Sequence, residues 1–149
     1  MREILFRGKT QKGEWVQGVP FFEEKRCFII EDLFICDEYN CTGAVNSMVI
    51  PETVGQYTGL TDKNGKKIFE GDIVKITDEN VDFETKAYIE FGNPNGQYNW
   101  GWQLVPLERK PFAVDILHWV EMEETGAFVE IIGNIYDNPE LLKGGEADA

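Results

Sequence analysis

The stretch GLTDKNGKKIFEGDIVKI, residues 59–76, combines the residue types of phosphate-binding and calcium-binding loops. A phosphate loop requires G-x-x-x-x-G-K-[ST], because successive backbone N–H groups must curl around one phosphate. Here Gly59 and Gly65 are one residue too far apart, and Lys67 stands where the magnesium-binding hydroxyl should be. In a calcium loop counted from Asp62, Lys67 occupies the position of the obligatory glycine. The stretch therefore matches neither kind of site.

The same stretch is typical of a β-hairpin. Asn64-Gly65 is a strong two-residue turn signal, since both central positions of a type I′ turn require positive φ. A turn closed there pairs Asp62 with Lys67, which carry opposite charges, across the two strands. A second turn follows, and FEGDIVKI then enters the next strand. The residues that we predict to be structural here are Asn64, Gly65, Gly71 and Asp72.

The next acidic loop, DENVDF, comes closer to a calcium site. Asp78, Asn80 and Asp82 occupy ligand positions 1, 3 and 5 of such a loop. However, Phe83 stands where the glycine is needed, and Ile89 replaces the bidentate glutamate. We interpret the segment as a solvated acidic loop between two strands and expect no metal there.

The sequence offers few residues for nucleophilic catalysis. His118 is the only histidine, so every Ser–His or Cys–His pair would have to use it. It lies beside Trp119 in an apolar segment, which favours a packed or hydrogen-bonded ring. Zinc requires four ligands at short spacings, whereas Cys36 and Cys41 are five residues apart and both Cys27 and His118 are far off in sequence. We predict no catalytic residue, no metal and no cofactor, and 27 acidic residues make chance carboxylate pairs too common to single one out.

A cluster of aromatic residues stands out in YNWGWQ, residues 98–103. In an extended strand, Tyr98, Trp100 and Trp102 would alternate onto one face. The favoured role of these rings is core packing, because aromatic side chains dominate core burial. The second role is a partner surface that stacks on the side chains of a bound protein. A platform for nucleic-acid bases is the least favoured role, because of the charge of the chain.

That charge is strongly negative, with 27 acidic residues against 14 lysines and arginines, a net charge of −13. Such a chain repels a phosphate backbone, so direct nucleic-acid binding is disfavoured and a basic protein partner is favoured. The N-terminus has no apolar core of signal-peptide length, and no run approaches the roughly 18 apolar residues of a membrane helix. Three irregularly spaced cysteines suit reduced thiols. We expect a cytoplasmic protein that does not contact membranes.

The periodicity of apolar residues predicts strands almost throughout. The predicted strands lie within residues 2–8, 13–19, 26–32, 47–59, 72–78, 85–91, 98–105, 112–122 and 128–136. The segment 112–122 is ambiguous, because Phe112, Ile116 and Trp119 also lie near helical spacing, and we assign it to a strand. Near the C-terminus, Asn138 is predicted to cap a short helix that begins at Pro139.

The predicted fold class is mainly β, a barrel or sandwich of short antiparallel strands with one or two short helices. One domain is expected over residues 1–142, either undivided or as two β lobes, roughly 1–50 and 51–142. Residues 143–149 are typical of a disordered tail.

Three motifs resemble the YopX protein family, whose members are encoded by phages and prophages. They are REILFRGKTQKGEWVQG at residues 2–18, PETVGQYTGLTDKNGKKIFEGDIVKI at 51–76 and IIGNIYDNPELL at 131–142. The resemblance covers nearly the whole chain, and the family varies over residues 23–46 and 78–125. It implies a mainly β fold with SH3-like barrel elements and action inside an infected bacterium. It implies no activity, cofactor or catalytic residue.

Three functional hypotheses follow. The first is a non-enzymatic binding or adaptor protein that engages a host or phage protein through an acidic surface containing aromatic residues, with DNA mimicry as a variant. The second is a small metal-dependent enzyme that uses carboxylates from residues 78–90. The third is a structural or assembly component that forms a homo-oligomer. We favour the first hypothesis.

Overall fold

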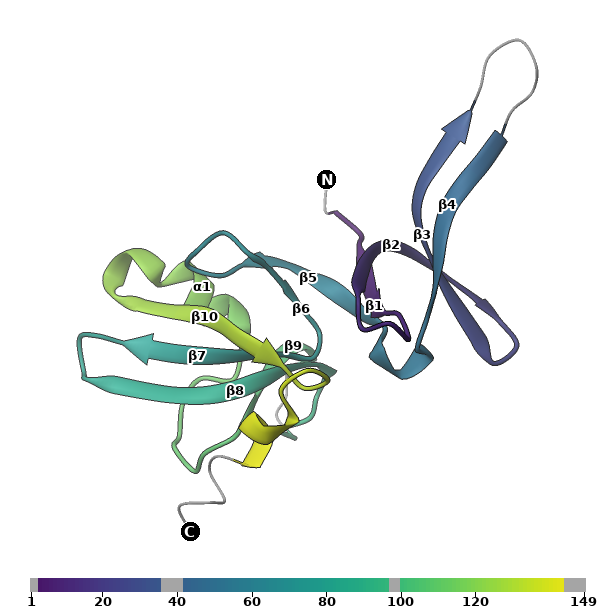
Figure 1. The fold of residues 1–149 in the computed structure, drawn as a ribbon. Coiled ribbons are helices and arrows are strands. Elements are labelled where there is room, and N and C mark those ends of the chain that lie inside the picture. Colours follow the sequence, from purple (N-terminus) through teal and green to yellow (C-terminus); the bar gives the residue numbers. More distant parts are fainter. Residues whose placement is uncertain (1–2, 36–41, 97–99, 144–149) are drawn as a thin grey trace. The chain divides into compact units, whose positions relative to one another are not determined.

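The computed structural model describes residues 3–35, 42–96 and 100–143. The chain divides into two compact units, Met1–Tyr57 and Thr58–Ala149 (Figure 1). Both units are built mainly from antiparallel strands, which confirms the predicted fold class. Within the described residues, neither strand order closes into a ring. No helix in this described part of the chain has the length and apolarity that crossing a membrane requires.

The first unit supplies the strands β4-β3-β2-β1-β5 of a six-stranded antiparallel sheet, whose last strand is β6 (Lys67–Phe69). Its elements are β1 (Phe6–Lys9), β2 (Trp15–Glu23), β3 (Arg26–Ile35), β4 (Thr42–Val49), the 3-10 helix η1 (Pro51–Thr53) and the start of β5 (Gly55–Thr61). Successive side chains of a strand point to opposite faces. On one face, Cys27, Ile29 and Val49 are buried and form the core of the unit. Partly buried side chains that pack against them are Phe6, Val16 and Val54.

The opposite face of β2, β3 and β4 also carries apolar side chains. Phe21 pairs with Phe28, which pairs with Met48, and Val19 pairs with Ile30 in the neighbouring row. Val19, Phe21 and Met48 are exposed, whereas Phe28 and Ile30 are half-buried. We call these five residues the apolar face of the first unit.

The second unit contains a four-stranded antiparallel sheet in the order β10-β7-β8-β9. Its strands are the rest of β5, β6 (Lys67–Phe69), β7 (Asp72–Asp78), β8 (Phe83–Gly92), β9 (Gly101–Pro106) and β10 (Ala127–Asn134). Alternation along β8 buries Thr85, Ala87 and Ile89, and register pairs Ile89 with Leu104 of β9. The buried core residues are Ile68, Val74, Ile76, Ala87, Ile89, Leu104, Ile116, Trp119, Ala127 and Val129.

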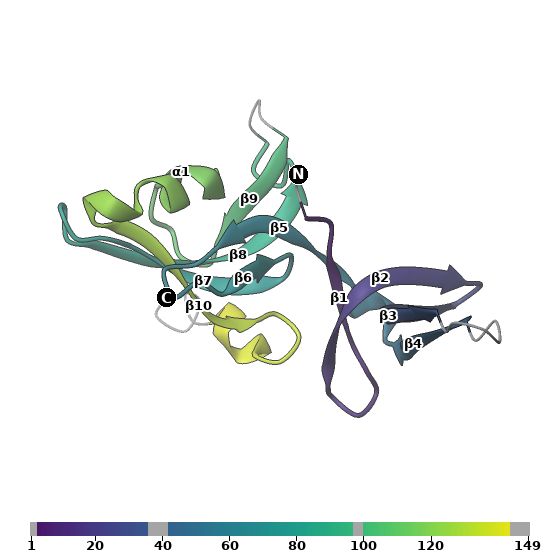
Figure 2. The same cartoon turned by 90° about the horizontal axis from the view of Figure 1, so that it is seen from above.

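The helix α1 (Ile116–Glu121) covers the core face of this sheet. In Figure 2, α1 lies on one side of the strands, and the C-terminal 3-10 helix η3 (Pro139–Lys143) lies on the other. The strand predicted over residues 112–122 is therefore wrong. The side chain of Asp115 caps the helix by accepting a hydrogen bond from Leu117 N at 3.0 Å. One helical turn then buries Ile116 and Trp119, three residues apart, on the same face.

The predicted hairpin at Asn64-Gly65 is confirmed by the pairing of β5 with β6, but its turn differs from the prediction. Gly65 has φ +79°, whereas Asn64 has no positive φ, so the turn is not type I′. Asp62 N donates to Lys66 O at 2.8 Å, and Gly65 N donates to Asp62 O at 3.0 Å. The loop therefore has three residues, and Asp62 pairs with Lys66 rather than with Lys67.

The carboxylate of Asp62 accounts for this turn. Its Oδ1 accepts hydrogen bonds from Asn64 N and Lys66 N, both at 2.9 Å. Its Oδ2 accepts from Ile131 N of β10 at 3.0 Å, which ties the hairpin to the four-stranded sheet. Asp62 is only 3% exposed, and hydrogen bonds to an ionised acceptor are the stronger kind. This side chain is therefore a structural anchor.

Gly71 and Asp72 have structural roles in the turn between β6 and β7. Gly71 has φ +89°, donates its N–H to Ile89 O and accepts from Ile135 N, both at 2.9 Å. Asp72 is 2% exposed, and its Oδ2 accepts from Phe69 N at 2.8 Å. A glycine is favoured at such a φ because it lacks a Cβ.

The C-terminal helix begins at Pro139, as predicted, but as a 3-10 helix. The backbone carbonyl of Asn138 accepts from Leu141 N at 3.0 Å. Its side-chain Oδ1 instead accepts from Asn134 N at 3.2 Å, at the end of β10. The side chain of Asn138 thus joins the end of β10 to the start of η3.

Candidate functional site

The aromatic residues predicted to lie on one strand face occupy different environments. Tyr98 lies outside the described residues. Trp100 directly precedes β9 and is 77% exposed, whereas Trp102 lies within β9 and packs against the core of the second unit. Of the three roles considered for these rings, core packing thus applies to Trp102, whereas the exposed Trp100 is available for a partner surface.

Trp102 has a defined packing partner on the neighbouring strand β8. Its ring meets Phe91 edge-on, with the centroids 4.9 Å apart and the planes at 61°. The two residues are also direct partners in the β8–β9 register. The indole Nε1 of Trp102 is buried, and within the described part of the chain it has no hydrogen-bond partner. This orphaned donor reduces the net contribution of the Trp102 ring to stability.

Phe91 and Trp100 extend this contact to the surface. Phe91 is 56% exposed, and a Cβ placed on the adjacent Gly92 would lie 3.7 Å from the ring of Trp100. The Trp100 ring therefore lies close to Gly92 at the end of β8, next in sequence to Phe91, which pairs with Trp102 of β9. We call Phe91, Trp100 and Trp102 the aromatic patch. Tryptophan supplies large contact area at little cost in conformational entropy, which suits protein recognition.

A second feature of this unit is a cavity of about 290 Å³ beside α1. Its lining residues are Asp78, Val81, Phe83, Pro111, Phe112, Ala113, His118 and Trp119. We call this cavity the aromatic pocket. Three of its residues form a ring cluster: Phe83 stacks on Trp119 with centroids 6.3 Å apart, and Phe112 lies 6.5 Å from Trp119 and 6.4 Å from Phe83.

The polar groups of the aromatic pocket are few. His118 lies in α1 and not in the predicted strand. Its side chain is exposed, and its ring lies edge-on to the Trp119 ring, with the centroids 5.7 Å apart. Asp78 Oδ1 accepts from Asn80 N at 3.0 Å and from Asn80 Nδ2 at 3.2 Å. The Trp119 indole donates to Ala113 O at 2.7 Å, which fixes the ring. The pocket thus combines fixed aromatic rings with one carboxylate.

The structure offers little for catalysis or metal binding among its described residues. Within them, no three His, Cys, Asp or Glu side chains are grouped so as to hold a metal ion. The loop of residues 79–82 joins β7 to β8 and is exposed, which confirms that it is a solvated acidic loop. Cys27 is buried in the first unit, and Cys36 and Cys41 lie outside the described residues.

Two groups have a shifted pKa. Burial raises the pKa of the Cys27 thiol above its ordinary value of 9.0, and a backbone hydrogen bond at Phe21 opposes that shift. Burial also raises the pKa of Tyr88 above 10.0, and the negative charge of Glu90 adds to the effect. Both shifts favour the neutral form in the folded protein, which is the opposite of what an activated nucleophile requires.

The charge is divided unevenly between the units. By sequence, the first unit has nine acidic and six basic residues, a net charge of −3. The second unit has 18 acidic and eight basic residues, a net charge of −10. Whatever attraction the chain has for a basic partner is therefore concentrated in the second unit.

The solvent face of the four-stranded sheet nevertheless mixes both signs of charge. Lys75 lies 3.5 Å from Glu84 and 3.7 Å from Glu130, and Lys63 lies 3.4 Å from Glu130. DNA mimicry requires acidic groups spread over one face without lysines between them. This face of β7, β8 and β10 does not have that pattern.

Comparison with known proteins agrees with this fold. The model of the YopX protein family matches residues 5–143, so the chain belongs to the YopX family. The SPbeta prophage-derived uncharacterized protein YopX of Bacillus subtilis strain 168 is 32% identical over 80 residues. That match spans 54% of this chain and 53% of the relative, about half of each. The family and this relative support a phage origin.

A solved structure has the same fold. The crystal structure of protein EF1440 from Enterococcus faecalis matches with a TM-score of 0.56 and 24% sequence identity. The match covers 95% of this chain and 99% of that protein. The mainly β architecture is thus shared over almost the whole length of both chains.

The aromatic pocket was not foreseen from the sequence. Its residues come from the end of β7, the start of β8, the segment before α1 and α1 itself, which only the tertiary fold brings together. The near-helical spacing of Phe112, Ile116 and Trp119 was the one local indication of the helix that forms part of this pocket. The segment was nevertheless assigned to a strand.

Proposed function

We propose that this protein is a non-enzymatic binding or adaptor protein of a phage. It acts in the cytoplasm of the bacterial host on a host or phage protein. The observation that carries the proposal is the exposure of Trp100, 77% of whose surface is open to solvent. Single exposed apolar side chains are common on protein surfaces, but the Trp100 ring lies close to Gly92, the residue that follows the exposed Phe91.

Energetics support a binding role for this side chain. An aromatic side chain buries about 150–250 Å² when it is covered, and tryptophan is enriched among the residues that dominate interface affinity. Truncation of such a residue typically weakens binding by at least about 2 kcal/mol, or roughly thirtyfold in Kd. The contact of Trp102 with Phe91 and with the core orients these two rings before binding, and such preorganisation lowers the entropic cost of binding.

The charge of the second unit adds a requirement on the partner. Its net charge of −10 speeds association with a basic surface and opposes association with another acidic chain. A protein with an apolar contact surface and a basic rim fits both features. The same repulsion argues against a homo-oligomer formed through this unit.

The test is a quantitative pull-down from the lysate of phage-infected host cells. Wild-type protein is compared with Trp100→Ala and with the control Ile4→Ala, which removes a side chain of similar exposure, 69%, from the first unit. The partner should be retained by the wild type and by Ile4→Ala, and recovery should fall at least about tenfold with Trp100→Ala.

Thermal unfolding is measured in parallel for all three proteins. An unchanged melting temperature for Trp100→Ala shows that a loss of partner reflects a lost contact. If Trp100→Ala retains every partner that the wild type retains, the aromatic patch is not the binding surface and the proposal fails.

A further inference from the structure

The aromatic pocket is separate from the aromatic patch, although both belong to the second unit. The pocket lies between the β7–β8 turn and α1, whereas the patch lies at the other end of β8 and the start of β9. Phe83 at the first residue of β8 belongs to the pocket, and Phe91 near its end belongs to the patch. A ligand of the pocket therefore does not need to contact Trp100.

We propose that the aromatic pocket binds a cationic side chain, lysine or arginine, presented by a protein. The size of the cavity supports one side chain as the occupant. Its volume of about 290 Å³ lies just below the roughly 300–1,000 Å³ typical of ligand pockets, and it is widely open to solvent. That volume suits a single long side chain better than a nucleotide or another large cofactor.

The ring cluster supplies the first attraction for a cation. Phe83, Phe112 and Trp119 lie within 6.5 Å of one another, and all three line the cavity. Ring faces carry negative electrostatic potential, so a cation within about 6 Å of a ring centroid is attracted by about 0.5–2 kcal/mol. The apolar stem of lysine or arginine packs on the same rings.

The carboxylate of Asp78 supplies the second attraction. It lines the cavity at the end of β7, and its hydrogen bonds from Asn80 hold it in place. Further exposed acids stand nearby in sequence, Glu79 and Asp82 in the β7–β8 turn and Glu121 at the end of α1. An anionic ligand would be repelled by this arrangement, and a neutral one would gain nothing from it.

The neighbouring lysine does not neutralise the pocket. Lys110 precedes the lining residue Pro111, but its Nζ lies 3.3 Å from Glu108 and donates to Glu84 O at 2.7 Å. Its charge is therefore already compensated by other groups. Among the described residues, no lysine or arginine lies over the three rings of the pocket.

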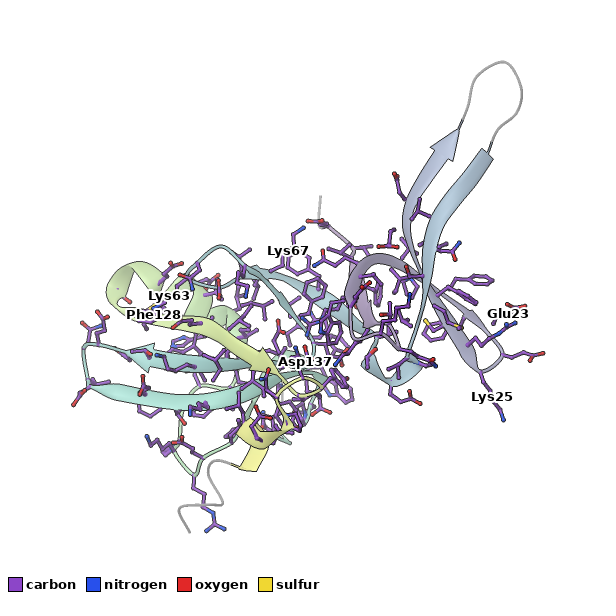
Figure 3. All side chains as sticks on the ribbon, viewed as in Figure 1. Glu23, Lys25, Lys63, Lys67, Phe128 and Asp137 are labelled. Carbon is purple, nitrogen blue, oxygen red and sulfur yellow. The ribbon has the colours of Figure 1, made fainter. Side chains whose placement is uncertain are left out.

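Elsewhere the chain pairs its own cations with aromatic rings. Lys63 Nζ lies 4.5 Å from the centroid of Phe128, and Figure 3 shows the two side chains together on the second unit. Arg7 lies 4.6 Å from the Trp15 ring in the first unit. The proposed contact uses the same chemistry, with the cation supplied by another molecule.

The test uses wild-type protein, labelled with ¹⁵N, and two small probes that differ in charge. Nα-acetylarginine amide supplies the cation, and Nα-acetylcitrulline amide is its neutral counterpart of the same shape. The readout is the indole N–H signal of Trp119, with the Trp100 indole as an internal reference. The Trp119 signal should shift saturably with the arginine probe, and the shift should weaken as salt is added.

Two substitutions identify the contributing groups. Asp78→Asn keeps an oxygen to accept from Asn80 while removing the charge, and should weaken binding of the arginine probe about threefold to fivefold. Phe112→Leu keeps an apolar side chain while removing the ring, and should weaken it by a similar factor. The matched control Glu140→Gln removes one charge from η3, away from the pocket, and should leave binding unchanged.

Three results would overturn the proposal: no shift of the Trp119 signal, an equal shift with the citrulline probe, or a shift confined to Trp100. The outcome is independent of the proposed partner surface. Trp100→Ala protein should bind the arginine probe like the wild type, so that failure at one site leaves the other interpretable.

Discussion

Among the described residues, the core of the second unit contains ten buried side chains, whereas the core of the first contains three. The first unit has apolar residues on both faces of β2, β3 and β4, but only one face is buried. The second unit buries the inner face of its sheet under α1 and places charged residues on the outer face. The two units are therefore built from similar strands, but the second unit buries many more apolar side chains than the first.

This difference has a consequence for stability and function. Hydrophobic stabilisation increases with the apolar area removed from water, so the second unit is expected to be the more stable body. Both the aromatic patch and the aromatic pocket lie on it, and binding sites are most effective on rigid elements. The first unit, with its exposed apolar face and small core, is expected to open more readily.

The largest expected effect comes from one substitution made in each core. Ile76 and Ile29 are both fully buried, and Ile→Ala costs about 2–5 kcal/mol at such sites. Ile76→Ala should lie in the upper half of that range, because its ten-residue core leaves a cavity that cannot collapse. Ile29→Ala should lie in the lower half, because the three-residue core can rearrange. Urea unfolding measures both, and equal losses would remove the distinction between the units.

The anchor of the β5–β6 hairpin is the next test. Asp62→Ala removes the acceptor of three backbone hydrogen bonds and should lower the free energy of unfolding by about 3 kcal/mol. Asp62→Asn keeps one oxygen acceptor and serves as the conservative control, with an expected loss of about 1 kcal/mol. Chemical denaturation distinguishes them, and a neutral Asp62→Ala would show that the carboxylate does not anchor the hairpin to β10.

A smaller effect is expected within the aromatic patch. Trp102→Ala should lower the free energy of unfolding by about 2–3 kcal/mol, less than the roughly 3–5 kcal/mol usual for large aromatic residues, because among the described residues its buried indole N–H has no partner. Trp100→Ala should change it by no more than about 0.5 kcal/mol, as is usual for surface substitutions. A similar loss for both variants, measured by thermal and urea unfolding, would show that Trp100 is also a packing residue.

The smallest expected effect is a fall in the free energy of unfolding at alkaline pH. It should begin at a lower pH for Cys27 in the first unit than for Tyr88 in the second. The pKa of Cys27 is raised in the folded state, so its contribution to stability is complete below about pH 9 and is lost as pH rises through the folded pKa. The limiting slope is about 1.4 kcal/mol per pH unit. Tyr88 in the second unit has the same sign but begins above its own ordinary value of 10.0.

The measurement for this pH effect is urea unfolding between pH 8 and about pH 11, past the ordinary pKa of both groups. The variant Cys27→Ala should lose the decline that begins near pH 9 while keeping the one that begins near pH 10. A wild-type protein whose stability does not change between pH 8 and pH 10 would contradict the role of the buried thiol.

Local patterns in the sequence were sufficient for the strands and the family. Alternation in β3, β7 and β8 and the three family motifs correctly predicted a mainly β fold. The turn signal at Asn64-Gly65 placed the hairpin but not its turn type, because the Asp62 carboxylate that accepts from Asn64 N and Lys66 N is also bonded to Ile131 N, 69 residues away. Local propensity contains no information about such a contact.

The helix α1 was missed for a related reason. Its six residues are fewer than two helical turns, and such a length gives little periodicity to read. The cap by Asp115 and the burial of Ile116 and Trp119 against the sheet decide the conformation, and tertiary packing of this kind supplies most helical stability in proteins. The aromatic pocket depends on that helix and so was not predicted either.

The central claim is that the second unit is the more stable body that holds both candidate sites. Native-state hydrogen exchange tests it most directly, because it reports the free energy of opening at each backbone amide. We predict that amides of β7, β8 and β10 exchange only through global unfolding, and that amides of β2 and β3 exchange at least about tenfold faster, a difference of about 1.4 kcal/mol. Equal or slower exchange in β2 and β3 would contradict the claim.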